Sequence, residues 1–299
     1  MHVTLLGTAA GGGFPQWNCA CAGCRTARHD PAAALPRTQS SAAVSADGRH
    51  WFLLNASPDV PAQLALLPPE PPAGPRRLPI EGVILTDAEL DHTLGLLLLR
   101  EGGSVPIHAT GAVRSTLEQD SRILPVLRAF ADLPLTTLEE GVPAPLRHRG
   151  GEASGLTVEA FAVPGHAPRF ATRNDPGHTV GLLVRGEDHA CAYVPGCAAL
   201  DPALVSRLTG LDLVLFDGTF WSDGELSAVT GGSRSAREMG HLPISGPGGS
   251  LEILPRLGGP VVYVHLNNTN PVLLEGSPER AAVVAAGLAV GADGMTFTL

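Results

Sequence analysis

Acidic and histidine side chains recur directly after apolar, strand-like runs in this sequence. The first such segment follows residues 82–86 and supplies four metal-capable side chains within six positions, namely Asp87, Glu89, Asp91 and His92. Side chains at a strand end are held by rigid structure and exposed at the sheet edge. The segment therefore predicts a metal site. The alternative is an acidic start to the helix expected at 93–101, where the helix dipole favours Asp and Glu.

Three more segments repeat this pattern later in the chain. Asp217 follows the apolar run 213–216, His265 ends the run 261–265, and His166 follows the run 156–163. Each has an ordinary alternative, such as an Asp-Gly turn or an Asx turn. Their repetition indicates one metal cleft shared by several strand ends. His241, in a Gly- and Pro-rich loop, is a candidate for proton transfer, or alternatively a helix cap.

A second candidate metal site lies near the amino terminus. Three of the five cysteines, Cys19, Cys21 and Cys24, stand within six residues. In a chain expected to be cytosolic, this spacing favours a metal site over a disulfide framework. Cys191 and Cys197 lie in apolar surroundings and are expected to be small buried side chains.

Composition excludes several classes of function. All 20 basic residues are arginine, so there is no lysine for a P-loop, a pyridoxal Schiff base or a lysine nucleophile. The net charge of −9 argues against nucleic acid as a partner. No apolar run approaches the roughly 20 residues that span a bilayer, and the amino terminus lacks a signal-peptide pattern. We therefore expect a cytoplasmic protein.

The apolar pattern predicts a layered α/β protein formed by one domain over residues 1–299. We expect strands at 2–8, 41–46, 51–55, 82–86, 105–108, 156–163, 180–184, 190–194, 213–216, 261–265 and 295–299. We expect helices at 58–67, 111–121, 202–208, 233–239 and 278–287. Residues 68–79 are Pro-rich and predict an exposed linker loop, and residues 141–154 predict an irregular stretch.

These motifs resemble the metallo-β-lactamase superfamily. Its His-x-His-x-Asp-His motif aligns with residues 87–92, but Asp87 and Glu89 replace the first two histidines, whereas Asp91 and His92 match. Within the superfamily, the sequence resembles the coenzyme pyrroloquinoline quinone (PQQ) synthesis protein B family across residues 7–294. The segments that carry this resemblance are 11–24, 37–41, 55–59, 217–221, 239–246 and 265–271.

The resemblance implies an αββα sandwich of two mixed sheets. It also implies an iron-dependent hydroxylase that uses O2 on the tyrosine ring of a Glu-Tyr precursor of PQQ. A carrier of PQQ or its precursor to the periplasm, and a metal-dependent hydrolase, are the alternatives. The missing histidines count against the hydrolase, because two-metal hydrolysis needs a full ligand set. A homodimer is compatible with the sequence.

The resemblance also implies roles for individual residues. One Fe(II) ion would be held by Asp91, His92 and His265, with Asp217 as a fourth ligand; two histidines and one carboxylate favour non-haem iron. His241 would be an acid, base or substrate-binding group.

Two further positions are open to more than one role. Arg37 would pair with a substrate carboxylate or, alternatively, pin a loop. His166 stands where relatives commonly carry lysine, so it would be either a metal ligand or a source of charge or hydrogen bonding.

For the cysteine cluster, the resemblance implies a structural Zn²⁺ ion. Cys19, Cys21 and Cys24 supply three thiolates, and tetrahedral zinc needs a fourth ligand. His29 and Asn268 are the candidates, although asparagine is a poor zinc ligand.

Overall fold

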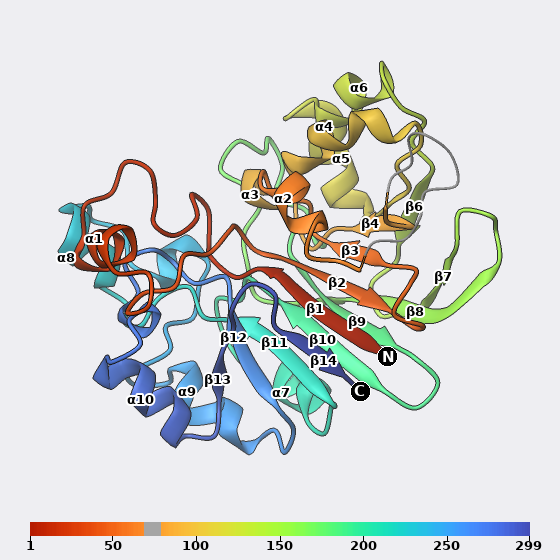
Figure 1. Ribbon diagram of the computed structural model, residues 1–299. Helices are drawn as coiled ribbons and strands as arrows, with labels where there is room; N and C mark the ends of the chain where they lie inside the picture. The colour runs from red at the N-terminus through yellow and green to blue at the C-terminus, as the bar shows by residue number, and fades with distance from the viewer. Residues whose placement is uncertain (69–78) are drawn as a thin grey trace.

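Two seven-stranded sheets pack face to face in the computed structural model, which describes residues 1–68 and 79–299 (Figure 1). The first sheet contains, in spatial order, β14 (Thr296–Thr298), β1 (His2–Gly7), β2 (Ser41–Ser45), β3 (Phe52–Leu54), β4 (Gly82–Ile84), β5 (Ile107–Thr110) and β6 (Leu135–Leu138). The second contains β13 (Ala289–Val290), β12 (Val261–Val264), β11 (Leu213–Asp217), β10 (Ala190–Val194), β9 (Val180–Arg185), β8 (Ala153–Ala162) and β7 (Ala144–Arg147). Both sheets are mixed: β3 to β6 are parallel, for example, whereas β1 is antiparallel to both its neighbours.

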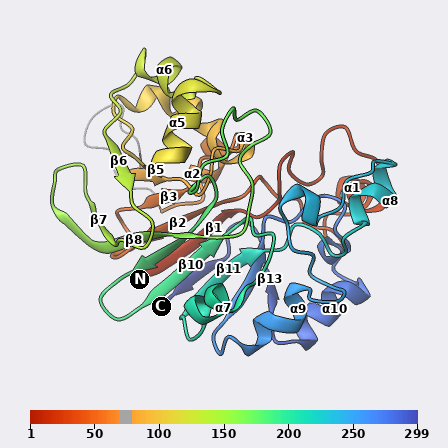
Figure 2. The same ribbon diagram turned by 180° about the vertical axis from the view of Figure 1, so that it is seen from behind.

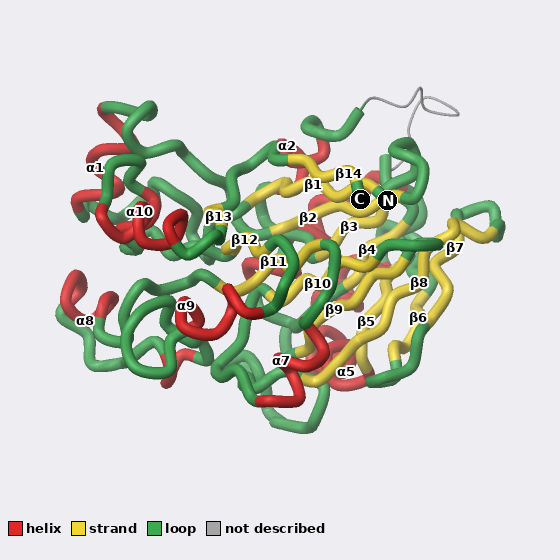
Figure 3. The backbone as a smooth tube through the Cα atoms, turned by 90° about the horizontal axis from the view of Figure 1, so that it is seen from below, coloured by secondary structure: helices red, strands yellow, loops and turns green. Residues whose placement is uncertain are grey.

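Helices cover the outer faces of the two sheets, and the strands occupy the centre of the molecule (Figures 2 and 3). On the first sheet lie α2 (Val60–Leu64), α3 (Leu90–Thr93), α4 (Gly95–Leu98), η1 (Leu99–Gly102), α5 (Gly111–Gln119) and α6 (Ile123–Arg128). On the side of the second sheet lie α1 (Ala22–His29), α7 (Pro202–Leu208), α8 (Glu225–Thr230), η2 (Arg237–Met239), α9 (Ser250–Ile253), η3 (Leu254–Arg256), η4 (Pro271–Leu273) and α10 (Pro278–Ala285). None of the helices in the described ranges is long and apolar enough to cross a membrane.

Successive side chains point to opposite faces of each strand, and this alternation builds three apolar layers. Leu5 and Leu215 point between the sheets, where residues of both sheets form one buried cluster. Their neighbours Leu6 and Phe216 point the other way, into the clusters beneath the helices of the first and second sheet respectively. Because both faces of each sheet are covered, the strands are apolar on both sides. The predicted four-layer αββα sandwich is confirmed.

The predicted strands are all present, with shifts of up to three residues at their ends. Two other predictions are wrong. Residues 141–154 contain β7 and the start of β8, which are paired across the turn at Gly151. Residues 233–239 form only the short turn η2, because Ala236 alone in that segment is buried and no apolar face stabilises a helix. The linker predicted at 68–79 lies outside the described residues except at its two ends.

The buried hydroxyl of Tyr263 ties β12 to α9, since it lies 2.8 Å from the Ser250 hydroxyl. We expect Tyr263→Phe to lower the free energy of unfolding by about 1–2 kcal/mol, because the Ser250 hydroxyl is then left unpaired. Urea denaturation measures the change. The double variant with Ser250→Ala should lose less than the sum of the two single variants. Strict additivity would contradict a direct interaction.

Candidate metal centre

The carboxyl ends of several strands meet at one edge of the sandwich. β11 and β12 are parallel with Asp217 opposite Val264, so Asp217 and the next residue, His265, leave the second sheet side by side. From the first sheet, the segment after β4 reaches the same edge, where Val180 N–H donates to Thr86 O at 2.9 Å. The sequence prediction of one shared cleft therefore agrees with the topology.

Two groups of candidate ligands gather at this edge. In each group the ligand atoms lie within 4.8 Å of one another: Asp91, His92 and His265 form one, and Asp217, His241 and His265 form the other. The set Asp91, His92 and His265 is the one expected from the sequence. Asp217, expected as their fourth ligand, instead groups with His241. One of its oxygens accepts the Cys197 N–H at 2.9 Å.

His92 presents one ring nitrogen without a partner. Its ring is almost fully buried, and Nδ1 lies 2.8 Å from both oxygens of Asp87. A carboxylate only accepts, so Nδ1 carries a proton and Nε2 is the ring atom that can bind a cation once its own proton is lost. Among the described residues, Nε2 of His92 has no hydrogen-bond partner. A buried ring nitrogen of this kind, oriented by a carboxylate on the opposite nitrogen, is typical of a metal-ligating histidine.

Neither Asp87 nor Glu89 belongs to a candidate ligand group in the described part of the chain. The Asp87 carboxylate accepts from His92 and from the Thr86 hydroxyl at 2.7 Å, so it positions the His92 ring. Glu89 lines the cavity beside them. Burial and the negative charges of Asp87 and Asp91 raise the pKa of Glu89 to about 7.

Thr219, which the sequence analysis missed, connects the second group. Its hydroxyl donates to Asp217 Oδ1 at 2.6 Å and lies 2.8 Å from His265 Nδ1. Because the single hydroxyl proton goes to the carboxylate, the oxygen accepts from His265 Nδ1–H, and Nε2 of His265 is the ring atom that can bind a cation. That Nε2 lies 3.2 Å from Asp91 Oδ2. The Asp-Gly-Thr sequence at 217–219 was the available signal.

His241 is the candidate acid at the centre. Its Nδ1 lies 2.8 Å from Asp217 Oδ2. Burial favours neutral imidazole, but the charge of Asp217 outweighs it and raises the pKa of His241 above its ordinary value. The ring also lines the cavity. A protonated imidazole at this position can donate a hydrogen bond or a proton to a bound molecule.

A cavity of about 360 Å³ lies over these groups. Asp91, His92, His241 and His265 contribute to its lining. His166 is exposed on its wall, and among the described residues it joins neither ligand group. The lining also includes Arg169 and Arg234, which the sequence analysis did not select.

Arg37 does not line this cavity. Its side chain is buried, and Nη1 donates to Thr8 Oγ1 at 2.9 Å and to the carbonyl of Gly291. The guanidinium thus ties the loop before β2 to the loop after β13. This geometry favours the loop-pinning alternative over the expected binding of a substrate carboxylate, because the buried guanidinium lies away from the cavity.

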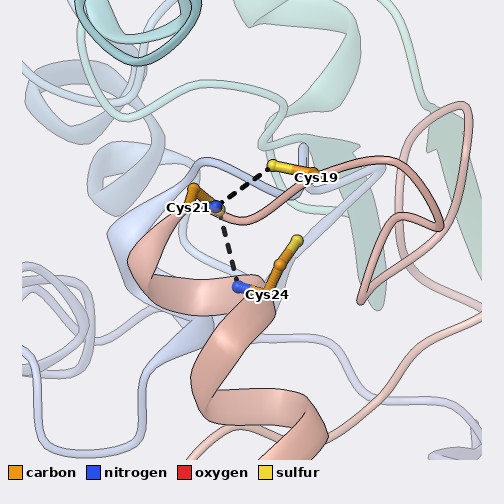
Figure 4. A group of neighbouring side chains, drawn as sticks. All are labelled: Cys19, Cys21 and Cys24. Carbon is orange, nitrogen blue, oxygen red and sulfur yellow. Dashed lines mark hydrogen bonds between the residues drawn. The ribbon is translucent and has the colours of Figure 1, made fainter.

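The three cysteines form a separate cluster at the start of α1 (Figure 4). The Sγ atoms of Cys19, Cys21 and Cys24 lie within 4.8 Å of one another. Asn268 Nδ2 lies 3.4 Å from Cys24 Sγ, so Asn268 faces the cluster. His29 is exposed and, within the described chain, stands outside the group. Burial and the neighbouring thiols raise the pKa of Cys21 to about 11, so a thiolate there needs a cation.

Comparison with known proteins identifies the family. Residues 50–265 match the Beta-lactamase superfamily domain. The chain is 41% identical to coenzyme PQQ synthesis protein B of Methylobacterium radiotolerans, with 100% of both chains covered. The identity to the protein of the same name from Pseudomonas aeruginosa strain PAO1 is also 41%, again with 100% of both covered. The chain belongs to the coenzyme PQQ synthesis protein B family.

Solved structures agree with this assignment. A crystal structure of Zn²⁺-bound PqqB from Methylobacterium extorquens is 40% identical, covers 100% of both chains and superposes with a TM-score of 0.91. A diphosphatase of the PhnP family is 19% identical with a TM-score of 0.70 over 100% of this chain and 97% of its own, which shows the shared fold alone.

Metal content tests the different positions of His92 and Asp87. We expect His92→Ala to lose the metal of this centre. Asp87→Asn should lower its affinity roughly 10–100-fold, because Asp87 only orients the ligand. Elemental analysis and calorimetric titration measure both. Asp47→Asn is the matched control, since Asp47 pairs with His50 at the surface at 2.7 Å. If Asp87→Asn removed the metal as completely as His92→Ala, Asp87 would be a ligand.

The buried position of Arg37 predicts an effect on stability. We expect Arg37→Met to reduce the free energy of unfolding by about 2–4 kcal/mol, because Thr8 and the Gly291 carbonyl lose a charged partner. Chemical denaturation measures this. Arg185→Met, at the exposed end of β9, should cost about 0.5 kcal/mol or less. Unchanged stability with weakened substrate binding would restore the substrate-binding role.

Proposed function

We propose that this chain is an iron- and O2-dependent hydroxylase that acts on the tyrosine ring of a Glu-Tyr precursor in the synthesis of coenzyme PQQ. The observation that carries the proposal is the set of three convergent ligands, Asp91, His92 and His265. The family supplies the pathway, since its curated members are named for PQQ synthesis. The reaction type is inferred from the two imidazoles and one carboxylate of this candidate ligand set.

The residues fit an iron ion better than a two-metal hydrolytic centre. Two imidazoles and one carboxylate with open positions suit non-haem Fe(II), which when bound supplies the activation of O2. The orphaned Nε2 of His92 is the structural sign that a cation belongs here. A second metal bound through the superfamily motif would need ligands at 87 and 89, but the Asp87 carboxylate already accepts hydrogen bonds from His92 and Thr86. This arrangement disfavours the hydrolase.

Other residues of the site orient the histidines and carry protons. Asp87 and Thr219 fix the tautomers of His92 and His265, so both Nε2 atoms face inward. His241, held by Asp217, carries a proton beside the cavity. It is therefore placed to donate that proton to the substrate. Glu89 is a second proton carrier near neutral pH.

We further propose that Cys19, Cys21 and Cys24 hold a structural Zn²⁺ ion. Three clustered sulfur atoms at the start of α1 are the basis for this assignment. Asn268, whose Nδ2 lies 3.4 Å from Cys24 Sγ, is the candidate fourth ligand and joins the cluster to the loop that follows His265. An ion at this position would fix the loop that follows the metal ligand His265.

One experiment tests the function. The protein is loaded with Fe(II) without oxygen and mixed with Glu-Tyr, O2 and ascorbate. One oxygen atom should enter the ring and the other leave as water, with two electrons from ascorbate and two protons. Mass spectrometry should find a product heavier by one oxygen atom, absent with His265→Ala and with the zinc-loaded protein.

Two other results would contradict the hydroxylase. Glu-Tyr that binds tightly but returns unmodified from iron-loaded protein would indicate a carrier. Cleavage of a phosphodiester such as bis(p-nitrophenyl) phosphate by the zinc-loaded protein, without oxygenation by the iron-loaded one, would indicate a hydrolase.

A further inference from the structure

Two arginines on the cavity wall have no acidic partner among the described residues. Arg169 lies in the loop between β8 and β9, is exposed, and makes no hydrogen bond or ion pair with any of those residues. Arg234 precedes η2, and within the described part of the chain its guanidinium donates only to the backbone oxygen of Glu238, at 2.8 Å. A guanidinium presents a planar set of donors that matches a carboxylate. Both side chains are thus available to a bound anion.

The loop that carries Arg169 is held by hydrogen bonds on both sides of it. Ala198 N–H donates to Pro164 O at 2.7 Å, and Thr179 Oγ1 donates to His166 O at 3.0 Å. Ala167 N–H donates to the side chain of Asn174 at 3.1 Å. The backbone that presents Arg169 is therefore fixed against β9 and the loop after β10.

The segment that carries Arg234 is fixed against the amino-terminal half of α8 and the residues just before it. Ser227 Oγ donates to Arg234 O at 2.9 Å, and Ala236 N–H donates to Asp223 O at 2.8 Å. This segment also meets the Arg169 loop, because a Cβ placed on Gly240 would lie 3.6 Å from His166 Cδ2. The two arginines thus stand on adjoining parts of one wall.

Charge is distributed unevenly over the lining. The acids Asp87, Glu89 and Asp91 lie with the histidines at the metal centre, whereas the arginines come from the two wall loops. Glu238 also lines the cavity, but its carboxylate accepts the Ser235 N–H at 2.7 Å and makes no ion pair with Arg234 in the described structure. A cavity of about 360 Å³ suits a small molecule.

We propose that Arg169 and Arg234 are specificity-determining residues that bind the carboxylates of a small polycarboxylate substrate and direct its other end toward His92 and His265. The inference rests on the proposed function only for the choice of Glu-Tyr as probe. Glu-Tyr carries two carboxylates, one for each arginine, and an aromatic ring as its third arm. Arginine recognition of this kind disfavours analogues that lack the carboxylates, because such analogues leave the guanidinium groups unpaired.

Calorimetric binding to the zinc-loaded protein without oxygen tests the proposal, since it needs no turnover. Arg169→Gln and Arg234→Gln should each weaken Glu-Tyr binding about tenfold. Neither should alter binding of Gln-Tyr amide, an analogue that lacks both carboxylates. Arg169→Lys and Arg234→Lys should be intermediate, because lysine keeps the charge but loses the fork. Binding of Glu-Tyr should also weaken as salt rises.

Arg237→Gln is the matched control, since Arg237 lies in the same segment as Arg234 but does not line the cavity. It should bind Glu-Tyr like the unmodified protein. The proposal is overturned if Glu-Tyr does not bind, if both glutamine variants bind it like Arg237→Gln, or if they lose both ligands equally. Discriminating binding without oxygenation would support the arginines and overturn the hydroxylase.

Discussion

The hydrogen bonds between Asp87 and His92 Nδ1 are the interaction on which the candidate centre depends. Both side chains are buried, so the carboxylate and the imidazole would each be costly without the other. Their pairing fixes the tautomer of His92 and directs Nε2 inward. Burial alone would lower the pKa of His92, but the charges of Asp87 and Asp91 raise it to about 9. A cation at Nε2 must displace that proton, so the same pair couples metal binding to pH.

The fold maintains this pair by joining the two sheets at one edge. Asn55 holds Thr86 by donating to its hydroxyl at 2.8 Å and accepting its N–H at 2.9 Å, while Thr86 O accepts from β9. Gly95 lets α4 approach the loop after β3, which begins at Asn55. A Cβ at position 95 would lie only 2.1 Å from Ser57 O in that loop. His265 adopts the left-handed conformation, with φ of 58°. Strain of this kind in a non-glycine residue is typical of functional positions.

The acids at 87 and 89 distinguish this chain from the histidine-rich metallo-β-lactamase motif. In the described structure Asp87 hydrogen-bonds to His92, Glu89 lines the cavity, and neither acid joins the two candidate ligand groups. Asp87 thereby orients His92, which is a member of the first group. Arg169, Arg234 and His166 come from loops on another part of the lining. The acids and the arginines thus occupy different parts of one cavity.

The sequence by itself determined the fold class, most strands and the family. It also selected Asp91, His92 and His265 as candidate metal ligands, and the structure brings these three together. These follow from apolar periodicity and from motifs at strand ends, which are local properties of the chain. The tertiary structure decided that Asp87 contacts His92, that Thr219 links Asp217 to His265, and that Arg37 points into the protein. It also brought Arg169 and Arg234 to one wall. These outcomes depend on contacts between segments far apart in sequence, and spacing along the chain does not specify which atoms meet when two sheets pack.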